Sequence, residues 1–183
     1  MIRILIPAAL AAVLAAPTAR AQATAGSAPV NDALFAQAAA ASGMGEVAVS
    51  EIGVSRAVDP ELKAFSQRAA ADHSKLNQEL ATLAAQKGIA LPRELDVRAQ
   101  FCGQSLSGES RENFDRCYAK AQLMIHLEAV AAFEAEAQRG QDADVKALAA
   151  KALPKIKEHL HMIKPIAMKY EKEHQEASGK SEK

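Results

Sequence analysis

Apolar side chains recur along most of this chain with the period of an α-helix. Between Pro60 and Lys87 they stand three or four positions apart, which places them on one face of an amphipathic helix. Asp59 followed by Pro60 is a strong helix start, and Gly88 is a typical helix stop. The pattern therefore predicts a helix over residues 60–87.

The same period predicts three further helices. The first begins at Asn31 or Asp32 and ends near Arg56. Another is expected over residues 109–139, just before Gly140, and the last begins at Asp142. Four amphipathic helices joined mostly by short connections can bury their apolar faces against one another, which favours a bundle.

Two features interrupt this pattern. Pro154 and Pro165 lie inside the last apolar stripe and are expected to kink that helix or to split it near Leu153. The segment from Gly88 to Gly108 has few periodic signals and is predicted to be a long loop between helices 2 and 3. Such a connection would let the third helix run beside the second, as in ferritin-like bundles.

The composition fits close-packed helices. Hydrophobic residues make up 49% of the 183 residues, but there is no Trp and there are only five Phe, so Ala and Leu must fill the core. The β-branched runs that are typical of strands are missing. The predicted fold is an all-α four-helix bundle over residues 31–176, followed by a disordered tail over 177–183.

The N-terminal residues have the pattern of an export signal. Arg3 supplies a positive charge, an apolar run follows, and Ala19-Arg20-Ala21 forms a small-x-small cleavage site. We expect a signal peptide over 1–21, a flexible lead-in over 22–30, and a periplasmic or secreted protein. The apolar run is too short for a permanent membrane span, so no stable membrane insertion is expected after cleavage; an uncleaved anchor remains the alternative.

The charge balance and the two cysteines indicate which partners and which covalent link to expect. Lys and Arg number 22 and Asp and Glu number 22, a balance that argues against a nucleic-acid partner. In an exported protein, Cys102 and Cys117 are expected to form a disulfide, which would close a loop of about 15 residues and stabilise the fold by about 3 kcal/mol. Two unpaired thiols are the alternative.

Three histidines stand within the apolar stripes of three different helices. His73, His126 and His159 would each need a hydrogen-bond partner or a metal ion if buried. Glu46 can face inward from the first helix. These four residues are the candidate ligands of a transition-metal ion in the bundle core. Packing of the histidines as polar core residues paired with acids is the alternative.

Other chemistry finds less support. Di-iron carboxylate bundles carry Glu-x-x-His on two helices, whereas in this chain that spacing falls on the last predicted helix alone, at Glu158 and His161 and, in its polar end, at Glu171 and His174. Met124, Met162 and Met168 could indicate copper, but methionine in helices more often fills the core. No serine lies in a nucleophile elbow. A catalytic residue is therefore not expected.

The chain also resembles a known family. The resemblance covers about residues 34–163 and depends on motifs in a fixed order: Gly45-Glu46-Val47, Leu62-Lys63-Ala64-Phe65, Asp72-His73, Leu83-Ala84-Ala85-Gln86-Lys87-Gly88, His126, Phe133-Glu134, Leu153-Pro154 and Lys157-Glu158-His159-Leu160. This order is similar to a widespread bacterial secreted domain of unknown function in the ferritin-like superfamily, often labelled "putative membrane protein". The resemblance implies a ferritin-like bundle outside the cytoplasm. It implies no activity.

Three functional hypotheses follow. The first is an exported bundle that binds a metal ion through its histidines and Glu46, in metal handling or envelope stress. The second is a non-catalytic structural or adaptor bundle that binds a protein partner or itself. The third is a redox or metal-dependent enzyme.

Overall fold

The computed structural model describes residues 28–181, which form five α-helices. The helices are α1 (Asp32–Arg56), α2 (Pro60–Lys87), α3 (Val97–Gly108), α4 (Arg111–Arg139) and α5 (Ala143–Ser181). No strand occurs within this range. The predicted signal peptide lies outside the described residues, as does most of the predicted lead-in. None of the described helices is long and apolar enough to cross a membrane.

The four long helices begin and end close to the predicted positions because their ends are capped as the sequence indicates. The Asn31 side chain accepts the Leu34 N–H, and Asp59 accepts the Glu61 N–H at the start of α2. Gly88 ends α2 in the left-handed conformation, with φ of 66°. Local chemistry therefore sets these helix ends.

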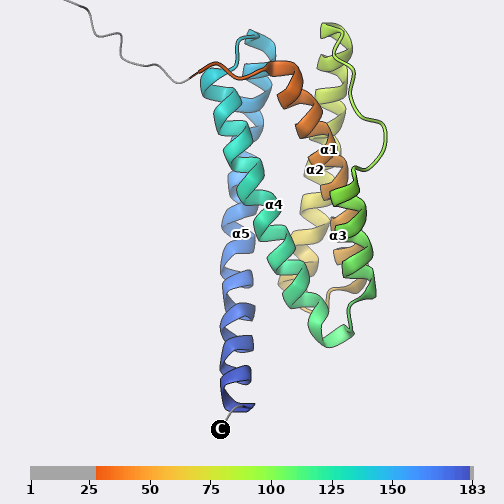
Figure 1. Cartoon of the computed structure of the whole chain (residues 1–183), viewed down its shortest axis with the longest axis vertical. Coiled ribbons are helices and arrows are strands. Elements are labelled where there is room, and N and C mark those ends of the chain that lie inside the picture. Colours follow the sequence, from red (N-terminus) through yellow and green to blue (C-terminus); the bar gives the residue numbers. More distant parts are fainter. Residues whose placement is uncertain (1–27, 182–183) are drawn as a thin grey trace, which may run out of the picture.

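The helices form two antiparallel pairs, α1 with α2 and α4 with α5, that pack side by side (Figure 1). The connection after α2 passes along the bundle before α4 begins, so α4 runs in the same direction as α2 (Figure 1). Apolar residues gather in two clusters. One includes Phe65, Phe114 and Tyr118, and the other includes Phe35 and Phe133, whose rings pack edge to face.

The predicted loop between helices 2 and 3 is wrong in part, because residues 97–108 form α3. Residues 28–181 therefore form five helices rather than four. Asp96 caps α3 by accepting the Ala99 N–H. Arg56, at the end of α1, donates hydrogen bonds to backbone carbonyls of Leu106, Ser107 and Glu109 at the far end of α3. This contact between distant segments holds α3 against the bundle.

The last helix also differs from one prediction. α5 continues through Pro154 and Pro165 as a single helix and is not split near Leu153. Each proline removes one backbone hydrogen bond, yet buried Ala152, Ile156, Ile163 and Ala167 keep one face of α5 packed on either side of the prolines. The helix extends past residue 176, where the bundle domain was predicted to end.

Candidate metal centre

Each of the four long helices places one ionisable side chain in the middle of the bundle. Glu46 comes from α1, His73 from α2, His126 from α4 and His159 from α5. The exposed fraction of these residues is 1%, 5%, 0% and 1%, respectively. Residues with so little exposure must satisfy their polar groups inside the protein.

The four side chains lie close together. One ring nitrogen of each histidine lies within 4.8 Å of a ring nitrogen of the other two. The Glu46 Oε2 atom is 3.8 Å from His73 Nε2 and 3.8 Å from His126 Nε2. The structure therefore brings together all four residues that the sequence selects as candidate ligands.

Hydrogen bonds around the cluster fix two of the imidazole rings. His126 Nδ1 donates to the backbone carbonyl of Gln122 at 2.9 Å, because a carbonyl can only accept. His159 Nε2 donates to Asp72 Oδ2 at 2.9 Å. These bonds leave lone pairs on His126 Nε2 and His159 Nδ1, and these two atoms are 3.4 Å apart. Two lone pairs at this distance repel each other unless a cation lies between them.

Burial controls the protonation of the cluster. Burial lowers the pKa of His73 to about 3 and that of His126 to about 4, and burial is also the main cause that lowers the pKa of His159. Burial raises the pKa of the Glu46 carboxyl to about 8. At neutral pH the three imidazoles are therefore neutral, which is the form that binds metal ions.

Several polar atoms of the cluster lack a partner. Neither carboxyl oxygen of Glu46 has a hydrogen bond to any described residue, and neither does His73 Nε2. A buried carboxyl without a partner is costly, since its oxygens have left water and gained nothing. A cation bound by Glu46 and the histidines would satisfy all three atoms.

This donor set fits a divalent first-row transition-metal ion. Three neutral imidazoles and one carboxylate are typical ligands of zinc and of its neighbours in the series. Ligand bonds of about 2.1 Å place nitrogens about 3.4 Å apart around a tetrahedral ion, so the cluster would contract slightly. The Gln122 carbonyl and Asp72 accept hydrogen bonds from the ring nitrogens of His126 and His159 that face away from the cluster. Metal-binding histidines in proteins are oriented by partners of this kind.

The predicted disulfide is not formed: Cys102 and Cys117 are both free. The two residues lie on α3 and α4 and have different neighbours. Burial raises the pKa of the Cys102 thiol, and nearby Glu46 raises it further. Burial also raises the pKa of the Cys117 thiol, whose charged neighbours are Glu109, Arg116 and Lys120. Both cysteines pack against the core cluster that includes Phe65, but from different helices, and the cysteine spacing alone did not show that the two thiols stay unbonded.

The sequence interpretation missed a polar layer next to the histidines. Gln122, one turn before His126, has no exposed surface, and its side-chain amide has no partner among residues 28–181. Ser50, one turn after Glu46, is buried in the same way. Tyr118 and Ser66 complete the layer with a hydrogen bond of 2.7 Å. The available signal was the helical spacing of Ser50 from Glu46, of Tyr118 and Gln122 from His126, and of Ser66 from His73.

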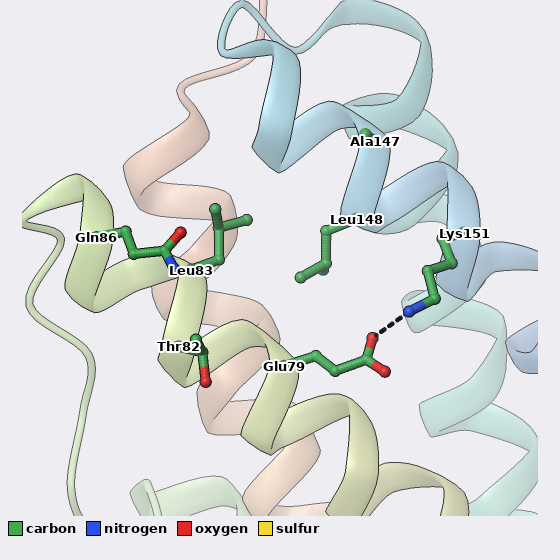
Figure 2. Close-up of a pocket in the computed structure, with 7 residues that line it drawn as sticks. All are labelled: Glu79, Thr82, Leu83, Gln86, Ala147, Leu148 and Lys151. Carbon is green, nitrogen blue, oxygen red and sulfur yellow. Dashed lines mark hydrogen bonds and ion pairs between the residues drawn. The ribbon is translucent and has the colours of Figure 1, made fainter.

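Two hollows reach the cluster from opposite sides. The α1/α3/α4 groove has a volume of about 400 Å³ and includes Glu46 in its lining. The α2/α5 cleft is smaller, about 190 Å³, and includes His73 and His159. A pocket next to this cleft is lined by aliphatic side chains, by polar Thr82 and Gln86, and by the Lys151–Glu79 ion pair, with 2.9 Å between Nζ and Oε2 (Figure 2).

The fold and the site define a class of protein: an all-α bundle with a buried histidine–carboxylate cluster shared by its four long helices. The chain belongs to the family described as a domain of unknown function, DUF4142, which matches residues 15–166. No curated protein matches the sequence.

A solved structure shares the fold. The crystal structure of a DUF305 fragment from Deinococcus radiodurans superposes with a TM-score of 0.66 at 10% sequence identity. The match covers 78% of this chain and 99% of the fragment. At this identity the likeness concerns the helical fold and not the residues of the cluster.

A second buried carboxyl, far from the histidines, leads to a prediction about pH. Glu136 has no exposed surface, and burial and the neighbouring Asp32 raise its pKa from 4.5 to about 7, against a smaller opposing effect of Lys146. Between pH 4.5 and about pH 7, the Glu136 carboxyl is therefore protonated in the folded protein, whereas in the unfolded protein it loses its proton near pH 4.5. The contribution of Glu136 to the free energy of unfolding is therefore fully present below pH 4.5 and declines as the pH rises to about 7.

Glu136→Gln removes this titration. We expect the free energy of unfolding of the variant, relative to wild type, to increase by about 3 kcal/mol between about pH 4.5 and pH 7.5. Urea unfolding at several pH values measures this difference. Glu112→Gln, at an exposed position on the same helix, is the control and should give an almost constant difference. A constant difference for Glu136→Gln would contradict the prediction.

Proposed function

We propose that this protein binds one divalent first-row transition-metal ion in the bundle core, with His73, His126, His159 and Glu46 as ligands. The observation that carries the proposal is the 3.4 Å approach of two imidazole nitrogens whose hydrogen bonds leave both as acceptors. The unpartnered Glu46 carboxyl beside them supports it. A core packed only for stability would not keep these groups in this arrangement.

The same features support metal handling rather than turnover. Four protein ligands complete a tetrahedral shell, which is typical of sites that hold an ion without an open position for a substrate. A ferritin-like arrangement is supported by the parallel course of α2 and α4 (Figure 1). The cluster has a single carboxylate, however, and so does not favour a di-iron centre.

Export to the periplasm or to the medium is part of the proposal. Its support is the sequence of the first residues, with Arg3, the apolar run and Ala19-Arg20-Ala21. Metal handling or a response to envelope stress would fit a metal-binding protein in that compartment.

Metal analysis of the wild-type protein tests the proposal. We expect about one equivalent of zinc or a neighbouring metal by elemental mass spectrometry of protein purified from the periplasm. Removal of the metal should lower the melting temperature, since an ion at a thousand times its Kd stabilises the fold by about 4 kcal/mol. Absence of metal, together with an unchanged melting temperature after addition of Zn²⁺ or Co²⁺, would overturn the proposal.

A second candidate function is a structural or adaptor bundle that binds a protein partner or itself. The observation that favours it is the exposed apolar surface of α3, where Val97 is 82% and Phe101 70% exposed. In this case the histidines would be core residues. Metal analysis separates the two candidates, because the second requires no ion.

A further inference from the structure

The α1/α3/α4 groove joins the protein surface to the buried Glu46. Its walls are mostly apolar side chains of α1 and α4, and α3 contributes Ala99 and Cys102. A Cβ atom placed at Gly45 would lie 3.0 Å from the Ala99 Cβ, so α1 and α3 approach each other closely there. By packing on α1, α3 therefore forms one wall of the groove.

Charges at the groove suit a cation better than those at the α2/α5 cleft. The groove is lined by one base, Arg98, which forms an ion pair of 2.6 Å with Glu128, and by a further charged acid, Asp96. Glu46 also lines the groove, and its raised pKa keeps it protonated at neutral pH until an ion displaces the proton. A surface with an excess of acids attracts cations and raises their local concentration.

The α2/α5 cleft has the opposite balance. Its lining includes three bases, Lys75, Lys151 and Lys155, against two acids, Asp72 and Glu79. Asp72 is also held by its hydrogen bond to His159. A metal cation approaching the histidines from this side would meet an excess of positive charge.

Two donor atoms lie along the groove before the histidines. Cys102 is half-buried in its wall and close enough to Glu46 for the two groups to affect each other's charge. The Glu46 carboxyl is 1% exposed, has no hydrogen-bond partner among the described side chains, and lies 3.8 Å from two of the histidines. Thiolate and carboxylate together form a suitable transient ligand pair for a divalent transition metal.

We propose that metal ions reach the histidine cluster through the α1/α3/α4 groove, and that Cys102 Sγ and the Glu46 carboxylate bind the ion on the way. This inference rests on the proposed function and adds a second, transient metal site to it. Cys102 is a ligand during uptake only, and Glu46 stays bound to the ion in the final site.

The transfer balances without any redox partner. When the ion binds Cys102 and Glu46, the thiol S–H bond and the carboxyl O–H bond break, metal–sulfur and metal–oxygen bonds form, and both protons pass to solvent. When the ion moves to the histidines, the metal–sulfur bond breaks and the thiolate takes a proton back from solvent. The metal keeps its oxidation state throughout.

Rapid mixing of metal-free protein with Co²⁺ tests the route. The visible absorption of Co²⁺ follows the arrival of the ion at the histidines, and sulfur-to-cobalt absorption in the near ultraviolet reports binding at Cys102. We expect Cys102→Ala to load about tenfold more slowly than wild type, with the same final spectrum and stoichiometry. Cys117→Ala is the matched control and should load at the wild-type rate.

The sulfur-to-cobalt absorption should rise and decay during loading of wild type and Cys117→Ala, and should be absent in Cys102→Ala. Cys102→Ser provides a second variant of nearly the same size and should also load slowly. Wild-type loading rates in both Cys102 variants would overturn the route. Loss of the final Co²⁺ spectrum in these variants would also overturn it, since Cys102 would then be required by the final site. Failure of wild type to bind Co²⁺ at equilibrium would instead overturn the proposed function itself.

Discussion

Simultaneous replacement of His73 and His159 with alanine is expected to abolish metal binding at the cluster. The double variant keeps only His126 and Glu46, which is half of the proposed ligand set. Structural zinc sites bind with about 10–16 kcal/mol, so the loss of two of four ligands should weaken binding by more than about a thousandfold. Titration with Co²⁺ or Zn²⁺ against a competing chelator measures this change.

His161→Ala is the matched control for the double variant. His161 lies on α5, two positions after His159, but its side chain is exposed. We expect the control to bind metal with wild-type affinity. Wild-type affinity in the double variant would contradict the proposed ligand set.

Stability measurements distinguish ligands from core packing residues. If the histidines only fill space, the double variant should lose the same free energy of unfolding with and without metal. If they bind an ion, added metal should stabilise wild type and leave the double variant unchanged. The melting temperatures of both proteins, measured in chelator and in excess Zn²⁺, decide between these outcomes.

Local signals predicted the long helices because local interactions form their ends. Asp59 accepts N–H groups of the first turn of α2, and Gly88 adopts the left-handed conformation that its position requires. These contacts lie within a few residues of each other in the chain. A single sequence therefore contains the information that places them.

The helix α3 was not predicted because its stability comes from distant contacts. It contains two glycines, and only one of its residues, Leu106, is buried, so it has no apolar stripe. Asp96 was a readable start signal. The hydrogen bonds from Arg56 to the end of α3, by contrast, join residues about fifty positions apart and could not be seen in the sequence.

The four residues of the candidate site could be selected from the sequence, but their supporting contacts could not. Histidine is unusual in an Ala- and Leu-rich stripe, and this selected His73, His126 and His159. Asp72, however, binds His159 on another helix rather than its neighbour His73. The predicted disulfide failed for a related reason, because cysteine spacing does not state how α3 and α4 orient their thiols.

Glu46→Gln is expected to stabilise the metal-free protein while it weakens metal binding. Burial raises the pKa of Glu46 from 4.5 to about 8, so the folded protein holds a proton that the unfolded chain releases near 4.5. The carboxyl therefore costs stability increasingly as pH rises through this interval. A neutral amide avoids that cost, and we expect a gain of about 3 kcal/mol at about pH 7 in the presence of chelator.

The effect on metal affinity has the opposite sign. An ion bound by Glu46 requires the carboxylate, and a neutral amide oxygen is a much weaker ligand, so we expect affinity to fall by about a hundredfold or more. Urea unfolding in chelator and metal titration measure the two effects on the same samples. Glu51→Gln, exposed on the same helix, should change neither. A residue retained for packing would give both effects the same sign or no effect on metal. Opposite signs are expected where a fold keeps a destabilising group because a ligand needs it.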